Sequence, residues 1–326
     1  MPPRIISISR RTDIPAFYGD WFLRRLDAGI VGWENPFGGR PQLVSLRRDD
    51  VRCLAFWSKN FRLFLPHLRT LQARGYPCFF NYTITGLPSI FEPRVVPMED
   101  AVDSLRELAS RFSPEHIQWR YDPIILSELT LAESHLDRFA ALAAALRGSV
   151  RRCIVSFAWR YRKVECNLAA LERATGVRIV DPDLPARRKL AEQLAGIAEA
   201  HGMTLHACCC NNLLGGRVHR AHCIDGEAIA RLYSGASCRT PRHPNRPECG
   251  CADSVDIGRY ETCLHGCVYC YANADPARAA AAVHAHDPNS LFLGRTREES
   301  KQLLQECRGA LDTEGAEGEM RAQRLL

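Results

Sequence analysis

Three cysteines in the last quarter of the chain have a spacing that suits iron chemistry. Cys263, Cys267 and Cys270 form a C-x3-C-x2-C pattern, and the aromatic Tyr269 directly precedes the last cysteine. Soft thiolates select iron–sulfur clusters over harder metals, and cysteine is the usual cluster ligand. Three thiolates on one short loop bind three irons of a [4Fe–4S] cube. The fourth iron then has no protein ligand and can bind a small molecule.

The same loop is compatible with a structural zinc ion. Zinc sites use four thiolates, or three thiolates and one imidazole. His265 lies inside the loop and is a candidate fourth ligand. Unliganded thiols are a third interpretation, and the spacing alone leaves all three open.

A second group of cysteines precedes this loop. Residues 208–210 are three consecutive cysteines, and a C-x-C pair follows forty residues later. Alternate residues of a strand face the same way, so at most two of the three consecutive cysteines can share a face. We choose Cys208 because it ends a predicted strand. The predicted second site binds either an iron–sulfur cluster or zinc. Its ligands would be Cys208, Cys223, Cys249 and Cys251. The alternative is that these thiols are buried and bind no metal.

The composition fits one large α/β domain or two ordinary ones. The chain has 326 residues, a hydrophobic fraction of 46% and a formal net charge of +6. It contains neither an apolar run near the roughly 18–20 residues that span a bilayer nor a signal-peptide pattern. We therefore expect a cytoplasmic protein without membrane association. Disulfides are rare in the cytoplasm, so fifteen cysteines indicate metal binding or catalysis. The small basic excess gives nucleic-acid binding only weak support.

Strand-like and helix-like segments alternate through the first two hundred residues. Strands separated by helices of ten to fifteen residues predict βαβ units and a parallel sheet. Six such strands indicate an α/β fold resembling a (β/α) TIM barrel, whole or partial, over residues 1–207. The predicted strands are 5–9, 51–57, 78–85, 117–125, 153–158 and 203–207, and the predicted helices are 18–29, 64–75, 99–112, 131–146 and 186–201.

The cysteine-rich region at residues 208–290 has a different character. Ten of the fifteen cysteines lie between residues 208 and 273, with little periodicity. A short strand at 254–258, the cysteine loop and a helix at 275–284 follow in the order of a barrel βα unit. We infer that this unit is displaced to the C-terminus, as in a circular permutation, and that barrel closure sets strand 254–258 beside strand 5–9. A separate metal-binding appendage is the alternative. The polar residues 308–326 predict a flexible tail.

Charged and polar residues follow almost every predicted strand. Chemistry in (β/α) barrels is located at the carboxyl ends of the strands, so these residues are expected to share one rim. Such a rim suits a polar ligand that carries a carboxylate. Ion pairs on the rim are the structural alternative. We predict Lys59, Arg120 and Asp122 as catalytic residues, and Arg10, Arg11, Asp13 and Tyr269 as cofactor-binding residues.

The cysteine loop resembles the signature of radical S-adenosylmethionine (SAM) enzymes, including the aromatic residue before the last cysteine. The segment CVYCYA at 267–272 is also similar to the cluster loop of spore photoproduct lyase-like members of that class. In these enzymes the open iron binds the amino and carboxylate groups of SAM, and reductive cleavage makes a 5′-deoxyadenosyl radical. The resemblance implies a [4Fe–4S] cluster, SAM, a small-molecule substrate and an electron donor such as flavodoxin or ferredoxin.

A second resemblance covers nearly the whole chain. From about residue 4 to 275 the chain resembles the DUF1848 family of bacterial proteins of unknown function, which implies no established activity. The motifs that carry this resemblance are ISISRRTDIP at 6–15, FWSKN at 56–60, WRYDP at 119–123, and CGCADSVDIG at 249–258 continuing through CYAN at 270–273.

The sequence thus predicts a radical SAM enzyme of unknown substrate on a barrel-like scaffold. Two alternatives remain open. One is a zinc or iron–sulfur protein without catalytic activity, and the other is a zinc-containing protein that binds nucleic acid.

Overall fold

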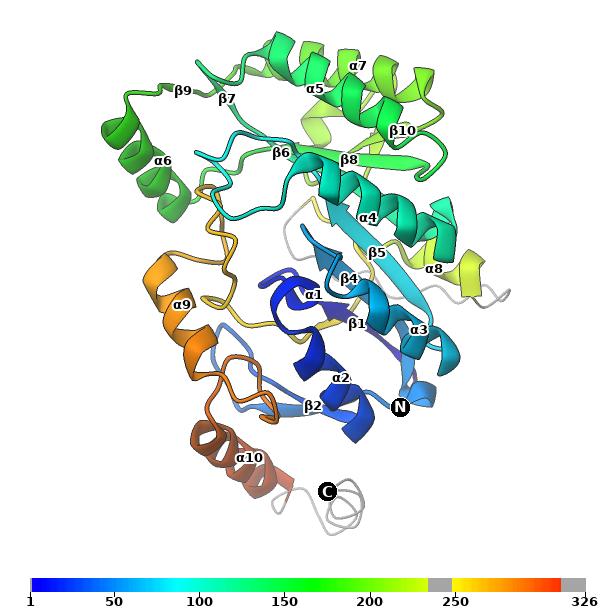
Figure 1. Ribbon diagram of the computed structural model, residues 1–326, viewed down its shortest axis with the longest axis vertical. Coiled ribbons are helices and arrows are strands. Elements are labelled where there is room, and N and C mark those ends of the chain that lie inside the picture. The colour runs from blue at the N-terminus through cyan, green and yellow to red at the C-terminus, as the bar shows by residue number, and fades with distance from the viewer. Residues whose placement is uncertain (1, 234–247, 312–326) are drawn as a thin grey trace.

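A parallel sheet of eight strands is the framework of the structure (Figure 1). The computed structural model describes residues 2–233 and 248–311. The strands of the large sheet are β1 (Arg4–Ile8), β4 (Val51–Ser58), β5 (Cys78–Thr83), β6 (Ile117–Ile124), β8 (Arg152–Phe157), β10 (Thr204–Ala207), β11 (Val218–Arg220) and β12 (Val255–Asp256). Their order is β11-β10-β8-β6-β5-β4-β1-β12, and every neighbouring pair is parallel.

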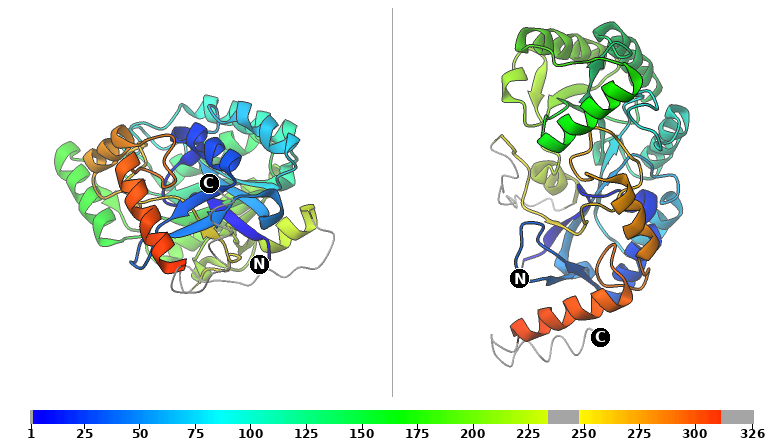
Figure 2. Two further views of the ribbon diagram at one scale, coloured as in Figure 1. Left: turned by 90° about the horizontal axis from the view of Figure 1, so that it is seen from below. Right: turned by 90° about the vertical axis from the view of Figure 1, so that its left-hand side faces the viewer.

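Helices connect the strands and cover the sheet (Figures 1 and 2). The helices are α1 (Ile14–Phe17), α2 (Gly19–Ala28), α3 (Leu65–Ala73), α4 (Met98–Arg111), α5 (Ala132–Ala145), α6 (Arg162–Thr175), α7 (Leu184–Ala200), α8 (Gly226–Tyr233), α9 (Pro276–Ala285) and α10 (Arg297–Leu311). The predicted strands and helices of the first 207 residues are all present with small shifts at their ends, which confirms the α/β class.

Several elements were not predicted. Two antiparallel pairs, β2 (Ile30–Trp33) with β3 (Gln42–Ser45) and β7 (Leu126–Ser127) with β9 (Ile179–Val180), lie outside the large sheet. These strands are short, so their apolar periodicity is too brief to detect. Helices α6, α8 and α10 were missed as well. Helix α10 extends through residue 311 into the predicted tail 308–326. Residues 312–326 lie outside the described part, so the flexible tail stays a prediction.

The two faces of the sheet pack against different partners because side chains alternate along each strand. One face carries residues such as Ile6, Phe56, Phe80 and Trp119, and it packs against α2, α3, α4, α5 and α7 in the main core. The opposite face carries Ile5, Cys53, Ala55, Phe79 and Ile154. It packs against the segments that contain Cys208, Cys223 and Cys251.

Strand β12 lies beside β1, as the permuted arrangement predicts. Ile6 pairs with Val255, and Ser7 pairs with Asp256. The sheet is open, however, because β11 and β12 are its two edge strands in the described part of the chain. The expectation of barrel closure is therefore wrong. With only two residues, β12 completes one edge and offers too little backbone to bond a further strand.

The C-terminal region packs directly on the first helices. The Tyr18 hydroxyl donates a hydrogen bond to the carbonyl oxygen of Thr262 (2.8 Å), and the Trp21 indole N–H donates one to that of Ser290 (2.8 Å). This packing argues against the alternative of a separate appendage. Among the described residues, the structure contains no helix that is both long and apolar enough to cross a membrane.

The Asp256 carboxylate ties the edge strand to β1. It accepts hydrogen bonds from the Ser7 and Ser9 hydroxyls (2.7 and 2.5 Å) and from the backbone N–H of Arg10 (2.8 Å). Burial alone would raise the pKa of Asp256, but the charges of Arg10 and Arg11 and these hydrogen bonds lower it overall. The ionised carboxylate is therefore favoured in the folded state.

We predict that Asp256→Asn lowers the free energy of unfolding by about 3–5 kcal/mol, because Arg10 loses its buried partner. The folded-state pKa of Asp256 is below the ordinary value of about 3.9, so its stabilisation is complete above that pH. It is lost as the pH falls through the folded-state pKa. Urea unfolding at pH 7 and near pH 3 measures both effects, and the difference between wild type and variant should shrink at the lower pH.

The control for this experiment is Asp253→Asn, which changes an exposed carboxylate three residues earlier. It should change the unfolding free energy by less than about 0.5 kcal/mol. Equal losses for the two variants would contradict the assignment of Asp256 as the tie between β12 and β1.

Candidate functional site

The three cysteines of the C-x3-C-x2-C motif lie on a loop that docks on the segment after β5. Within this cluster loop (residues 263–270), the backbone N–H of Val268 donates to the carbonyl oxygen of Phe91 (3.1 Å), and Arg94 N–H donates to that of His265 (3.2 Å). The Asn273 side-chain amide donates to the carbonyl oxygen of Cys263 (2.5 Å). The loop therefore has a defined position over the carboxyl ends of the strands.

Asp13 holds the loop against the strand ends. Its carboxylate accepts hydrogen bonds from the hydroxyl of Ser58 (2.7 Å), the last residue of β4, and from the backbone N–H of Lys59 (2.7 Å), which follows the strand. The same carboxylate contacts His265 Nε2 at 2.7 Å and caps the N-terminus of α1. The other imidazole nitrogen of His265 lies 3.3 Å from the Arg94 carbonyl oxygen. Both ring nitrogens of His265 are thus in contact with oxygen atoms of the protein.

A buried ion pair lies next to the cluster loop. The Lys59 ammonium donates to Glu92 Oε1 (2.8 Å), and Thr85 donates to the same oxygen (2.8 Å). The Tyr269 hydroxyl also bonds to Glu92, and the Lys59 ammonium lies 5.7 Å from the centre of the Tyr269 ring. Burial by itself lowers the pKa of Lys59, but Glu92 and Cys267 raise it overall. Lys59 therefore remains a cation beside the thiols.

The three thiols are half-buried, and burial raises the pKa of each. For Cys267 the pKa is raised to about 12, although the Lys59 charge opposes the effect of burial. The charge of Lys163 likewise opposes the increase that burial causes in the pKa of Cys270. Metal ligation requires thiolates, so a metal that binds here displaces protons, and the two lysines offset the resulting negative charge.

Arg120 and Asp122 lie on the face of the sheet opposite the main core. The Arg120 guanidinium bonds to Asp122, donates to the Cys223 sulfur (2.9 Å) and stacks 4.9 Å from the centre of the Trp57 ring. The Ser156 hydroxyl bonds to the second oxygen of Asp122. The predicted catalytic pair is therefore in contact with the second cysteine group.

The second cysteine group comes together from three distant segments. Cys208 and Cys223 have their sulfur atoms 3.2 Å apart. Cys251 interacts through its thiol with both Cys223 and Cys249. Hydrogen bonds from Cys208 and Cys251 and the charge of Arg120 hold the pKa of Cys223 well below its usual range.

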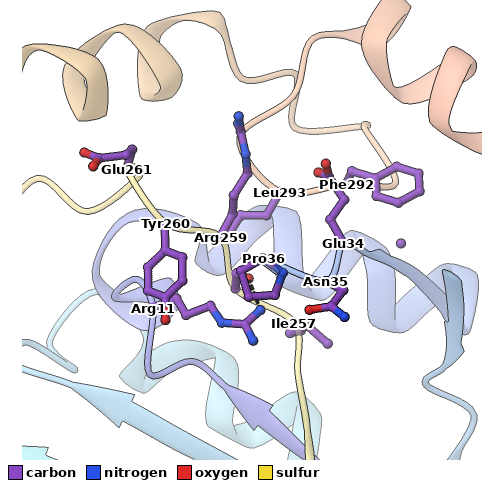
Figure 3. Close-up of a pocket in the computed structure, with 12 residues that line it drawn as sticks. Arg11, Glu34, Asn35, Pro36, Ile257, Arg259, Tyr260, Glu261, Phe292 and Leu293 are labelled. Carbon is purple, nitrogen blue, oxygen red and sulfur yellow. Dashed lines mark hydrogen bonds between the residues drawn. The ribbon is translucent and has the colours of Figure 1, made fainter. Parts of the chain in front are cut away.

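The predicted cofactor-binding arginines have different surroundings. Arg10 pairs with Asp256 at 3.3 Å. Arg11 lies 5.5 Å from the centre of the Tyr260 ring and donates to the Gly258 carbonyl oxygen (3.3 Å). Arg11 also lines a cavity of about 350 Å³ that contains no cysteine (Figure 3).

The structure thus brings most of the predicted residues into two neighbouring groups. Asp13, Lys59 and Tyr269 surround the cluster loop, whereas Arg120 and Asp122 adjoin the second cysteines. The negative charge of Asp122 also raises the pKa of Lys59, so the two groups interact electrostatically. No set of three or more His, Cys, Asp or Glu side chains in the described ranges is already arranged as a metal site, so a metal would have to draw the thiols together.

Sequence reasoning missed Glu92, Asp256 and Lys163. Glu92 follows the third predicted strand by several residues, in a segment with three prolines. Extending the search for acidic residues through that whole segment would have found it. Lys163 is far from the cluster loop in sequence, and no local signal indicates their proximity.

These features define an α/β protein with an open parallel sheet and two groups of cysteines near the carboxyl ends of its strands. The chain belongs to the family described as a domain of unknown function (DUF1848), whose sequence model matches residues 5–272. A search of curated proteins and a search of solved structures gave no match.

We predict that Glu92→Gln lowers the free energy of unfolding by about 3–5 kcal/mol, because it leaves the buried Lys59 cation without its partner. The double variant Lys59→Met/Glu92→Gln should recover part of that loss. Urea unfolding of the two single variants and the double variant gives the coupling energy.

The exposed pair Arg62–Asp100 is the matched control, since its side chains are 65% and 43% exposed. Asp100→Asn should cost less than about 1 kcal/mol. Additive effects at Lys59 and Glu92 would contradict the interpretation of this pair as a buried, coupled unit.

Proposed function

We propose that this protein is an iron–sulfur enzyme of the radical SAM type, with Cys263, Cys267 and Cys270 as the ligands of a [4Fe–4S] cluster. The observation that carries the proposal is the engagement of His265. An imidazole that contacts Asp13 and Arg94 with its two nitrogens is not free to become a fourth ligand. Three thiolates on one loop and no imidazole from that loop favour an open iron over a closed Cys3His zinc site.

The position of the loop gives further support. The pairing of β12 with β1 brings the cluster loop beside the segments that follow β1 and β4, at the carboxyl ends of these strands. Ligands of open α/β sheets bind outside the carboxyl ends of the strands. A molecule bound at the open iron would therefore have polar side chains from several strands within reach.

The residues of this chain have distinct roles in the proposal. When bound, the cluster supplies one electron for the reductive cleavage of SAM, and a flavodoxin or ferredoxin is the proposed electron donor. Lys59 and Lys163 offset the charge of the thiolates and attract the SAM carboxylate. Glu92 and Tyr269 fix the position of Lys59, and Asp13 fixes the loop through His265. Arg120 and Asp122 remain candidates for contact with a small-molecule substrate.

We predict that anaerobically reconstituted protein carries a [4Fe–4S] cluster whose reduced EPR signal shifts when SAM is added. The variant Cys263→Ala/Cys267→Ala/Cys270→Ala should lose that signal. It should also lose the dithionite-dependent cleavage of SAM to 5′-deoxyadenosine, which liquid chromatography measures.

Two variants make the test specific. Cys166→Ala removes an exposed thiol outside both groups and should leave the EPR signal unchanged. His265→Gln should keep the cluster iron and its response to SAM, because the proposal gives His265 no ligand role. Stoichiometric zinc in this loop, lost in His265→Gln, would refute the proposal and support a closed metalloprotein site.

A further inference from the structure

We propose that Cys208, Cys223, Cys249 and Cys251 form a closed site for a single zinc ion, separate from the cluster loop. The site joins the end of β10, the segment before α8 and the C-x-C segment before β12. It is independent of the radical SAM proposal, because none of its thiols belongs to the cluster loop.

One direct contact joins two of the four thiols, and the other two interact electrostatically with this pair or with each other. The Cys208 and Cys223 sulfurs are 3.2 Å apart, and the Cys251 thiol interacts with those of Cys223 and Cys249. Cys208, Cys223 and Cys251 are buried, and Cys249 is half-buried. Backbone hydrogen bonds bring the three segments together, and a metal would draw the thiols closer around itself.

The short separation of two of the sulfurs favours a single tetrahedral ion over a [4Fe–4S] cube. Zinc–sulfur bonds of about 2.3 Å in a tetrahedron place the sulfurs about 3.8 Å apart. The Cys208 and Cys223 sulfurs, at 3.2 Å, are already close to that separation. In a [4Fe–4S] cube each cysteine binds a different iron, so the cysteine sulfurs are much farther apart.

Backbone hydrogen bonds hold the three segments in place before any metal binds. Ala221 N–H donates to the Ala207 carbonyl oxygen (3.0 Å), which ties the Cys223 segment to β10. Ala252 N–H donates to the Ile224 carbonyl oxygen (2.9 Å), which ties it to the C-x-C segment. A Cβ on Gly250 would lie 2.6 Å from the His222 ring, so a larger residue between the two cysteines would force that ring to move.

Arg120 supplies the charge that such a site needs. Four thiolates around a dication leave a net negative charge, which is costly in a buried environment. The Arg120 guanidinium is buried and donates to the Cys223 sulfur at 2.9 Å. Hydrogen bonds to ligating sulfurs from outside the ligand set orient the ligands and raise metal affinity.

The fourth ligand is Cys249 and not Cys209. Residues two apart on an extended segment face the same side, so Cys249 and Cys251 can bind one ion together. Cys209 is the direct neighbour of Cys208 and adopts a left-handed backbone conformation, with φ of 49°. Cysteines two residues apart, such as Cys249 and Cys251, are therefore better placed to bind one ion together than the consecutive Cys208 and Cys209.

The test uses the full-length variant Cys263→Ala/Cys267→Ala/Cys270→Ala, which removes the cluster loop as a source of metal. Metal analysis by mass spectrometry should find about one zinc per chain. Adding Cys249→Ser to this variant should reduce the zinc content at least ten-fold under dialysis against a weak chelator. Cobalt substitution should give the visible bands of a tetrahedral thiolate site, and Cys249→Ser should weaken them. Cys249 is half-buried, so its change to Ser is compatible with folding, which circular dichroism checks.

Three controls delimit the site. Cys209→Ala and Cys53→Ala, added singly to the same background, should retain zinc, because the first lies outside the proposed ligand set and the second is a buried thiol of the same layer. Arg120→Gln should weaken zinc binding about 10- to 100-fold without abolishing it.

Several results would overturn the proposal. These are a metal-free background variant, iron with sulfide in place of zinc, a Cys208–Cys223 disulfide found by peptide mapping, or loss of zinc in Cys209→Ala but not in Cys249→Ser. None of these results bears on the cluster loop, so failure here is distinguishable from failure of the radical SAM proposal.

Discussion

The pairing of a two-residue strand with the first strand determines the arrangement of the whole candidate site. Backbone hydrogen bonds over two residues are too few to hold an edge strand, and the buried Asp256 carboxylate provides the rest through Ser7, Ser9 and Arg10. The cluster loop begins a few residues after Asp256, so its distance from β1 is fixed by this contact. If β12 were released, the thiols would lose their position relative to Asp13 and Lys59.

Buried charges in this protein are arranged in chains of contacts and are not isolated. Lys59 is paired with Glu92, Arg10 with Asp256, and Arg120 with Asp122 and the Cys223 sulfur. Each pair is buried, so loss of one partner is more costly than loss of an exposed pair. These pairs all lie near cysteines. In the proposed metal sites they would balance the negative charge of the thiolates.

The two groups of cysteines differ in a way that their sequence spacing does not reveal. The thiols of the cluster loop come from one short segment, whereas those of the second group come from three segments, and two of them, Cys208 and Cys223, are in contact. A cube that spreads its ligands over several irons suits the first arrangement, and a single tetrahedral ion suits the second.

The order of strand, cysteine loop and helix after residue 254 predicted the pairing of strand 254–258 with strand 5–9. The sequence by itself also determined the α/β class and most of the strands and helices of the first 207 residues, and it contains the two candidate groups of cysteines. These follow from local periodicity and from residue types at strand ends, which are encoded over short distances. Tertiary structure alone decided that the sheet stays open, that His265 bonds to Asp13, and that Glu92 and Lys163 adjoin the cluster loop. Each of these depends on contacts between segments tens to hundreds of residues apart, where the side-chain partners are chosen by packing and no local pattern records them.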